Sequence, residues 1–366
     1  MSSLEKYYPV HRCSPRNPLH RLFIAWLSAM VFAACLVAFP LGVDDRSPDV
    51  LLDPNLPHYE LIQGLTGTLH SVGSNRLDAM TFTWIRLFRK SYPGLTITME
   101  ARGNFTAAPA LTSGYADIAP TVFTFSDNEV ATFEQKYGYK PLFIRVSGGS
   151  YNKTEGTQAF AVFVHRDNPL KQLTLTQLDA IFSSTHRRGA KNDITTWGQL
   201  GLDGKWADMP ITLYSVRKVE ASASAFQDLV MLHGTFKPTL RERAASGTLD
   251  IDNLDAVVAA VANDPSAIGY AGFAQSTNEV KSLSIAESEG SPFIAATFDT
   301  VLNRQYPLSR FNYIYVNKPP GKPLPPMVRE FLRLILSAEG QRSIVEDGSF
   351  LPLPLSILKE ELAKIE

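Results

Sequence analysis

The sequence predicts an α/β fold, on two observations. After residue 59, short apolar runs of strand length alternate with longer segments in which apolar residues recur every three or four positions. Gly, Pro and Asn residues fall between these segments, where turns are needed. At about 150 residues per domain, the 366-residue chain has room for two domains.

The composition excludes several classes of protein. The formal net charge is −1, so a polybasic nucleic-acid binder is not expected. The densest basic stretch, residues 186–191, is polar and contains a glycine, and we interpret it as a solvated loop. Both cysteines, Cys13 and Cys35, lie near the N-terminus, which leaves the rest of the chain without a disulfide, a thiolate metal site or a cysteine nucleophile.

The first 45 residues have the pattern of a targeting segment. An apolar run at residues 22–43 follows four basic residues, Lys6, Arg12, Arg16 and Arg21. The run is typical of a signal peptide, but its ~20 residues are also enough to span a bilayer, so an uncleaved membrane anchor is an alternative. A lipoprotein signal ending at Cys35 is a third. In each case the remainder is exported to the periplasm or another extracytoplasmic space, and residues 46–57, rich in Asp and Pro, form a linker.

The first part of the chain alternates expected strands and helices. We expect strands at residues 61–69, 95–99 and 117–119, and a loop at 71–75. The first helix has one apolar face, made of Leu77, Met80, Trp84, Leu87 and Phe88. A second helix opens at Gly103 and ends at Gly114, because glycine readily takes the left-handed conformation that closes a helix.

The rest of the chain continues the alternation. Two apolar runs lie between residues 139 and 167, the second at 159–165, and Thr174 is placed to cap a helix at residues 175–182. Further expected elements are a strand at 211–214, helices at 224–232 and 254–263, strands within 293–316 and a helix at 326–336.

The most informative segments lie toward the C-terminus. They are Ala267-Ile-Gly-Tyr-Ala-Gly-Phe273 and Tyr306-Pro-Leu-Ser-Arg-Phe-Asn-Tyr-Ile-Tyr-Val-Asn-Lys-Pro-Pro-Gly321. Further landmarks stand at residues 137–141, 164–169, 173–175, 181–182, 194–197, 331–341 and 347–354. By the order and spacing of these segments, the chain resembles the periplasmic phosphate-binding proteins of bacterial ABC transporters.

This resemblance implies a type II periplasmic-binding-protein fold, in which two α/β lobes enclose a solute and two strands cross between them as a hinge. We place the crossings near residues 160–165 and 269–275. Lobe one then comprises residues 58–160 and 274–366, and lobe two residues 161–273. A protein of this kind binds phosphate or a related oxyanion and delivers it to an ABC permease, without cofactor, metal or catalysis.

Three turns between a strand and a helix are candidates for holding an anion, at residues 71–75, 102–106 and 220–224. Backbone N–H groups at helix N-termini and hydroxyl side chains bind oxyanions without a fixed countercharge. With the resemblance, these turns give the candidate ligand residues Gly73, Ser74, Asn75, Gly103, Asn104, Thr106, Arg217 and Ser222. The hydroxyl and amide residues among them are also ordinary N-cap and turn residues.

The turns depart from the family's pattern. Asn75 and Arg76 replace an acidic or hydroxyl residue and a hydroxyl residue, and Asn104 with Phe105 stands where relatives have two serines. Residues 122–123, Val and Phe, match a Ser-Arg pair in relatives, so the cationic ligand of that pair is missing.

The third turn departs further. Glu220 stands at the serine of a Ser-Gly-Thr turn, and the arginine expected upstream falls at Val216, with Arg217 one residue along. Arg76, Arg102 and Arg217 are candidates for a replacement clamp, because guanidinium groups match oxyanions. The departures leave an alternative function open: a diverged paralogue that binds another solute, or acts as a sensor or surface protein.

An enzyme is not expected. The histidines after the linker show no H-E-x-x-H or other metal spacing, and neither a Gly-x-Ser-x-Gly elbow nor a P-loop is present. Residues 250–253 look superficially like a calcium loop but lack its glycine and terminal glutamate, and we interpret their aspartates as helix caps.

Overall fold

The computed structural model describes residues 52–150, 157–242, 251 and 253–366. The predicted targeting segment at residues 1–45 and residues 46–51 of the predicted linker lie outside the described residues. No helix in the described ranges is both long and apolar enough to cross a membrane.

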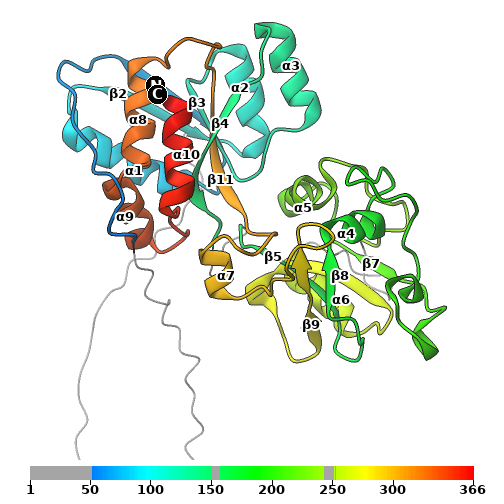
Figure 1. The fold of residues 1–366 in the computed structure, drawn as a ribbon. Helices are drawn as coiled ribbons and strands as arrows, with labels where there is room; N and C mark the ends of the chain where they lie inside the picture. The colour runs from blue at the N-terminus through cyan, green and yellow to red at the C-terminus, as the bar shows by residue number, and fades with distance from the viewer. Residues whose placement is uncertain (1–51, 151–156, 243–250, 252) are drawn as a thin grey trace, which may run out of the picture. The chain divides into compact units, whose positions relative to one another are not determined.

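A five-stranded mixed sheet organises one part of the fold, in the order β2-β1-β3-β11-β4 (Figure 1). Its strands are β1 (Thr68–Gly73), β2 (Thr96–Ala101), β3 (Ile118–Thr121), β4 (Leu142–Gly148) and β11 (Phe311–Val316). Strands β2 and β3 pair with β1 in parallel, and β11 runs antiparallel between β3 and β4. The carboxyl ends of β1, β2 and β3 therefore meet at one edge of the sheet.

Helices cover both faces of this sheet. On one face lie α1 (Asp78–Ser91), α8 (Pro326–Ile335), α9 (Ala338–Asp347) and α10 (Leu355–Ile365). On the other lie α2 (Ala107–Ser113) and α3 (Asp127–Tyr137). Each face of the sheet therefore has its own hydrophobic core, and alternate residues of β11 point into one core or the other. Ile314 packs in the core under α1, α8, α9 and α10, and Tyr313 and Tyr315 pack in the core under α2 and α3.

A four-stranded sheet organises the other part, in the order β7-β8-β5-β9. Its strands are β5 (Phe160–His165), β7 (Thr212–Tyr214), β8 (Ala267–Gly272) and β9 (Val280–Ser282). A separate two-stranded sheet pairs β6 (Gln172–Thr174) in parallel with β10 (Ser284–Ala286). Along the chain, β6 follows β5 and β10 follows β9. The helices here are α4 (Leu175–Phe182), α5 (Ala221–Met231) and α6 (Leu254–Ala262).

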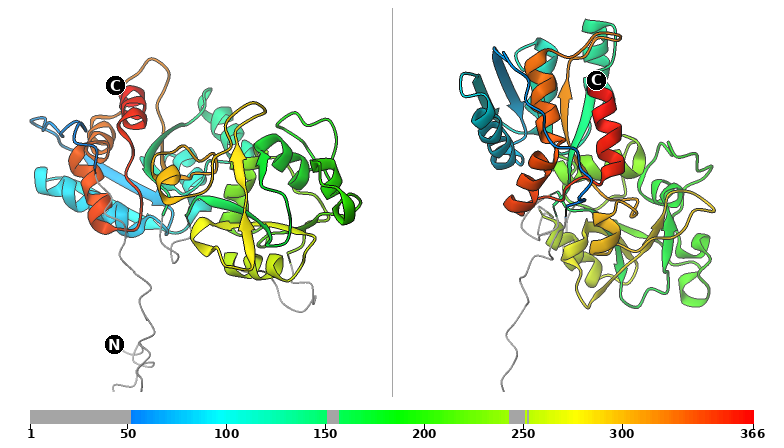
Figure 2. Two further views of the ribbon diagram at one scale, coloured as in Figure 1. Left: turned by 60° about the horizontal axis from the view of Figure 1, so that its bottom comes forward. Right: turned by 60° about the vertical axis from the view of Figure 1, so that its left-hand side comes forward.

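Aromatic packing fixes α5 on the four-stranded sheet. The ring of Phe226 on α5 stacks on Tyr270 of β8 at 3.7 Å between centroids, and Phe182 of α4 meets Phe226 edge-on at 5.1 Å. The neighbouring Gly269 faces α6, because a Cβ there would lie 2.7 Å from Val257. Helices α4 and α5 thus lie on one face and α6 on the other (Figure 2).

One predicted strand is wrong in position, and one predicted strand region forms a strand only at its end, β11 (Phe311–Val316). The strand expected at residues 61–69 begins only at Thr68, because Gly64 and Gly67 take φ values of 75° and 129°, which an extended strand does not admit. Residues 293–316 were expected to be strands, but α7 (Phe298–Leu302) lies among them, started by a capping box at Thr297.

The predicted lobe boundaries stay a prediction, and the strand pairing bears on one of them. Strand β9 pairs with β5, so residues 280–282 belong to the four-stranded sheet, and β10 pairs with β6, so residues 284–286 belong to the two-stranded pair. Lobe one was expected to resume at residue 274. Between residue 274 and β11, the chain first adds β9 and β10 to the strands of the second part.

The described end of the predicted linker is tied to the five-stranded part. His58 Nδ1 lies 2.8 Å from Glu339 Oε1, and the Tyr59 N–H donates to Glu339 Oε2 at 2.9 Å. The Ala338 N–H donates to the Pro57 carbonyl at 2.7 Å. These contacts attach residues 57–59 to the start of α9.

Candidate functional site

The first candidate turn follows β1 and is held close to the end of β3. A Cβ on Gly73 would lie 2.1 Å from the Pro120 carbonyl oxygen, so only glycine allows this approach. The Ser74 N–H donates to that same carbonyl at 2.8 Å, and the buried Ser74 Oγ accepts from the Arg76 N–H at 3.0 Å. The hydroxyl hydrogen of Ser74 is therefore available to a ligand, while Asn75 and Arg76 are exposed.

The second turn is bonded to the first. The Gly103 N–H donates to the Gly73 carbonyl at 2.9 Å, and Gly103 takes a φ of 112° before the short 3₁₀ helix Asn104–Thr106. Thr106 Oγ1 donates to the Gly103 carbonyl at 2.8 Å, so its hydrogen is already used. Thr106 can then act on an anion only after that bond breaks.

Asn104 links the second turn to the end of β3. Its buried Oδ1 accepts from the Val122 N–H at 3.0 Å and from Thr121 Oγ1 at 3.2 Å. Because a backbone N–H can only donate, the acceptor oxygen is fixed and Nδ2 remains as a donor. Within the described residues, no acceptor takes the backbone N–H groups of Asn104 and Phe105.

Residues 122–123 form an apolar wall beside these donors. Val122 and Phe123 are buried, and the Phe123 ring lies 5.7 Å from the ring of Phe105. Phe105 is 59% exposed. The absence of a Ser-Arg pair here, predicted from the sequence, thus leaves two aromatic rings at the carboxyl edge of the sheet.

A cation that the sequence did not single out lies behind this wall. Arg310 is buried at the start of β11, donates to the Val122 carbonyl at 3.1 Å and stands over the Phe160 ring at 4.9 Å. Burial lowers the pKa of Arg310 to about 10, which keeps it charged at neutral pH. Its only signal in the sequence was its place in the C-terminal run.

The third turn begins α5, at the carboxyl end of β7. Arg217 Nη2 lies 2.7 Å from Glu220 Oε1, so the acidic charge that sequence reasoning flagged is opposed by the arginine that it offered as a ligand. The Glu220 side chain does not cap α5. In the described part of the chain, the N–H groups of Ala221 and Ser222 have no acceptor, and Ser222 is half-buried.

The structure joins some of the predicted site residues and separates others. Gly73, Ser74, Gly103 and Asn104 share one bonded cluster at the edge of the five-stranded sheet. Arg217 and Ser222 belong to the four-stranded part. Arg102 pairs with Glu100 at 2.7 Å, so two of the three arginines proposed as a clamp are held by carboxylates.

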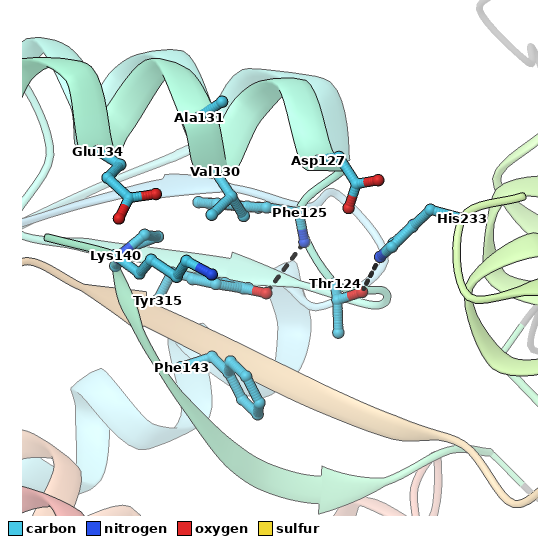
Figure 3. Close-up of a pocket in the computed structure, with 11 residues that line it drawn as sticks. Thr124, Phe125, Asp127, Val130, Ala131, Glu134, Lys140, Phe143, His233 and Tyr315 are labelled. Atoms are coloured by element: carbon cyan, nitrogen blue, oxygen red, sulfur yellow. Dashed lines mark hydrogen bonds between the residues drawn. The ribbon is translucent and has the colours of Figure 1, made fainter. Parts of the chain in front are cut away.

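A groove of about 470 Å³ lies beside this region (Figure 3). Its apolar lining comes from α3 and the sheet, with Phe125 stacked on Tyr315 at 3.7 Å between centroids. Thr124 Oγ1 lies 3.4 Å from His233 Nε2 at one end. None of the predicted ligand residues lines this groove.

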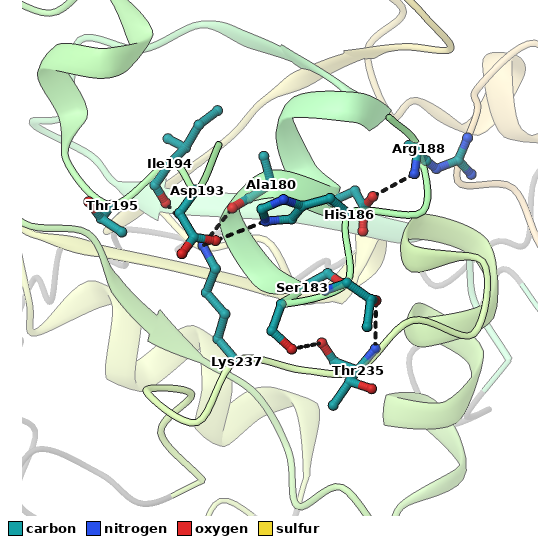
Figure 4. Close-up of polar contacts among 12 residues, drawn as sticks. Ala180, Ser183, His186, Arg188, Asp193, Ile194, Thr195, Thr235 and Lys237 are labelled. Carbon is teal, nitrogen blue, oxygen red and sulfur yellow. Dashed lines mark hydrogen bonds and ion pairs between the residues drawn. The ribbon is translucent and has the colours of Figure 1, made fainter. Parts of the chain in front are cut away.

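Polar contacts hold the segment that follows α4 (Figure 4), and one of its residues, Arg188, reaches the end of α5. Arg188 donates to the Val230 carbonyl at 2.6 Å, and its N–H donates to Asp179 at 2.7 Å. Lys237 Nζ lies 3.0 Å from Asp193 Oδ1, which also meets His186 at 2.8 Å. The basic stretch predicted to be a solvated loop is therefore partly engaged, and it helps to position α5.

No group of three or more His, Cys, Asp and Glu residues in the described ranges is arranged to hold a metal ion. Asp250 and Asp252 lie outside those ranges. The cap of α6 is Asn253, whose Oδ1 accepts from the Ala256 N–H at 2.9 Å.

Comparison of this chain with known proteins shows to which family it belongs. Residues 63–339 match the PBP superfamily domain. The chain is 39% identical over 332 residues to the phosphate-binding protein PstS of Pseudomonas aeruginosa, covering 91% of this chain and 97% of that protein. It is 25% identical over 271 residues to Protein SphX of Synechococcus elongatus, covering 73% of this chain and 72% of that protein.

Two solved structures share the fold. An ABC-type phosphate transport receptor from Vibrio cholerae matches with a TM-score of 0.52 at 18% identity, over 78% of this chain and 100% of that one. PstS from Borrelia burgdorferi matches with a TM-score of 0.52 at 17% identity, over 78% and 99%. The chain belongs to the PBP superfamily and, within it, to the family of the phosphate-binding protein PstS. The predicted family and fold class are confirmed.

Proposed function

We propose that this protein is an exported solute-binding protein that captures phosphate or a related oxyanion and delivers it to an ABC permease. The observation that carries the proposal is the set of unused backbone donors at two helix starts, on Asn104 and Phe105 and on Ala221 and Ser222. Membership of the PstS family supports it. The proposed role is reversible binding without turnover.

Unused donors suit a receptor that must release its cargo. N–H groups at a helix start point along the helix dipole toward an anion and carry no full charge. The hydroxyl of Ser74 and the amide nitrogen of Asn104 add donors on the five-stranded side, and the hydroxyl of Ser222 adds one on the other. An oxyanion needs several such donors at once, which two closing lobes bring together.

Negative charge opposes this proposal only at the third turn. Glu220 would repel a dianion, but Arg217 at 2.7 Å offsets it. Arg310, buried behind Val122, adds a positive field from the five-stranded side.

The remaining parts of the proposal follow the family. The predicted crossings near residues 160–165 and 269–275 lie on β5 and β8, which pair with each other, and we propose that the hinge lies at this pair and at the later return of the chain after β10. The protein works outside the cytoplasm, either as a free periplasmic receptor or tethered through residues 22–43. The ABC permease is its partner.

A second candidate function is a diverged receptor that has lost inorganic phosphate. Val122 and Phe123, both buried, stand where the family resemblance implies a Ser-Arg pair, and the Thr106 hydroxyl already donates within its own turn. These observations favour a protein that keeps the family fold but binds a different ligand.

Calorimetric titration of the full-length protein separates the two candidates. The protein is stripped of ligand by partial unfolding, refolded and titrated with phosphate, and then with sulfate and arsenate. One-to-one binding at micromolar concentration or tighter supports the oxyanion receptor. The absence of heat and of thermal stabilisation at millimolar concentrations of all three anions contradicts it.

A further inference from the structure

The connection between β3 and α3 contacts the four-stranded part directly. Arg187, in the segment that follows α4, donates from Nη1 to Asp127 Oδ2 at 2.6 Å. Asp127 is the first residue of α3 and belongs to the five-stranded part. The same Nη1 donates to the Leu232 carbonyl at 2.8 Å, at the C-cap of α5. One guanidinium group therefore joins the end of α5 to the start of α3.

Both helix ends favour the charge that lies beside them. The amino end of a helix stabilises a carboxylate and the carboxyl end stabilises a cation, as Asp127 and Arg187 provide here. The hydrogen bond from Arg187 lowers the pKa of Asp127 below its ordinary value of 3.8, so both groups are charged at neutral pH. An isolated exposed ion pair contributes little because water screens it, but this pair gains from two helix dipoles and from the bond to Leu232.

A second group of polar contacts joins the same two elements. The Asp228 side chain on α5 is 17% exposed, and its Oδ2 accepts from the Thr124 N–H at 3.4 Å. His233 Nε2 lies 3.3 Å from Asp228 Oδ1 and 3.4 Å from Thr124 Oγ1 (Figure 3). These distances are long for hydrogen bonds, so each contact is weaker than the bond from Arg187 to Asp127. Together they place α5 against the residues that follow β3.

We propose that these side chains form a latch that holds the two parts of the fold together and thereby strengthens anion binding. The latch consists of Thr124 and Asp127 on one side and Arg187, Asp228 and His233 on the other. Its effect on affinity rests on the proposed function. All five are positioning residues, and none is among the candidate ligand residues.

The latch acts through the elements that it joins. Helix α5 begins at the third candidate turn, and β3 ends beside Asn104 of the second, whose Oδ1 accepts from the Val122 N–H. Contacts between α5 and the residues after β3 therefore set how these turns are held. A receptor whose parts make contacts of their own in the binding arrangement spends less of the ligand's binding free energy on reaching it.

Charge reversal on either side tests the latch in the full-length protein. Asp127→Arg and Arg187→Asp each place two like charges where an ion pair stood. We expect both variants to show a larger radius of gyration by small-angle X-ray scattering after bound anion is removed. Calorimetric titration with inorganic phosphate should show a loss of affinity of about tenfold, because the attraction is lost and a repulsion is added.

A double variant assigns these effects to the pair. Asp127→Arg combined with Arg187→Asp restores an ion pair of reversed polarity, which both helix dipoles now oppose. It should therefore recover part of the loss, about threefold in affinity, together with a smaller radius of gyration. Glu279→Arg is the matched control, because it reverses one charge of another exposed pair, with Arg166 at 2.8 Å, that lies wholly within the four-stranded part. Thermal unfolding checks that each variant folds.

Each outcome decides one question. Single variants that match Glu279→Arg in radius and affinity overturn the latch, and so does a double variant no closer to the unaltered protein than the singles. Larger radii with unchanged phosphate affinity overturn its role in binding. If the unaltered protein binds neither phosphate, sulfate nor arsenate, the proposed function is overturned, while the radii still decide whether these residues hold the two parts together.

Discussion

Glu220 lies at the N-terminal end of α5, where the helix dipole favours negative charge in a ligand as much as in a side chain. In the ligand-free protein, Arg217 neutralises this carboxylate at 2.7 Å. An arriving oxyanion must therefore compete with Glu220 for Arg217 and for the dipole. The Arg217–Glu220 ion pair therefore lowers the affinity of the third turn for an anion.

Replacing Glu220 by Gln is expected to tighten phosphate binding about tenfold at low salt, because the carboxylate that competes with the anion for the helix dipole is removed. Calorimetric titration measures the change, and the gain should shrink as salt screens the charges. The control is Glu279→Gln, which breaks another exposed ion pair, with Arg166 at 2.8 Å. An unchanged affinity in Glu220→Gln would show that this turn does not face the anion.

The sequence could not predict which hydroxyl groups are free to donate a hydrogen bond to a ligand. Ser74 and Thr106 were predicted as equivalent ligands, yet the Thr106 hydroxyl donates to Gly103 while that of Ser74 accepts from Arg76. The difference depends on side-chain rotation within each turn, which no sequence pattern encodes. Arg310 was missed for a related reason, since its contact with Val122 joins residues 188 positions apart.

Local capping signals made some elements predictable. Helix α4 has the predicted bounds, residues 175–182, because Thr174 and Gln177 form a reciprocal capping box that the sequence shows directly. Helix α7 has the same kind of box at Thr297, but the apolar residues around it suggested strands. The strand expected at residues 61–69 was misplaced because a glycine's φ is not visible in a sequence.

The cap of α4 carries a prediction about stability. Thr174→Ala removes the hydrogen bond that Thr174 Oγ1 accepts from the Gln177 N–H at 3.1 Å, and should lower the free energy of unfolding by about 1 kcal/mol. Urea denaturation measures the loss. Thr132→Ala is the control, because this exposed hydroxyl donates to the Asn128 carbonyl within α3 and should change stability by less than about 0.5 kcal/mol. Equal effects of the two substitutions would contradict the role of the cap.

At the scale of the whole molecule, Glu339 joins residues 58–59 to α9. Burial raises the pKa of Glu339, but hydrogen bonds from His58 and the Tyr59 N–H outweigh it and lower the pKa to about 2. A carboxylate with a lowered pKa stabilises the folded state above its ordinary value of 4.5 and loses that effect as the pH falls toward 2.

Acid should therefore release this attachment between about pH 4.5 and 2. Because the Glu339 side chain is 41% exposed, solvent screens the pair and the stability at stake is about 1 kcal/mol. Thermal unfolding at pH 7 and near pH 2, with Glu339→Gln beside the unaltered protein, measures it. The two proteins should differ at pH 7 and approach each other near pH 2; a constant difference would contradict the assignment.

The family and the α/β architecture could be predicted from the sequence because long motifs and periodic patterns survive divergence. The ligand could not, since residues 75–76, 104–105, 122–123 and 220 all depart from the pattern that would identify it. What the structure adds is which donors remain unused and which apolar side chains adjoin them.

The attachment of residues 57–59 to α9 also limits how far a tethered receptor could travel. If residues 22–43 stay in a membrane, only 13 residues separate position 43 from position 57. Fully extended, they reach about 50 Å. A receptor tethered by so short a linker meets a permease in the same membrane at an effective concentration on the order of millimolar. Even a weak complex between receptor and permease would then be largely formed. Cleavage at the same segment would instead yield a carrier that searches the whole compartment at its bulk concentration.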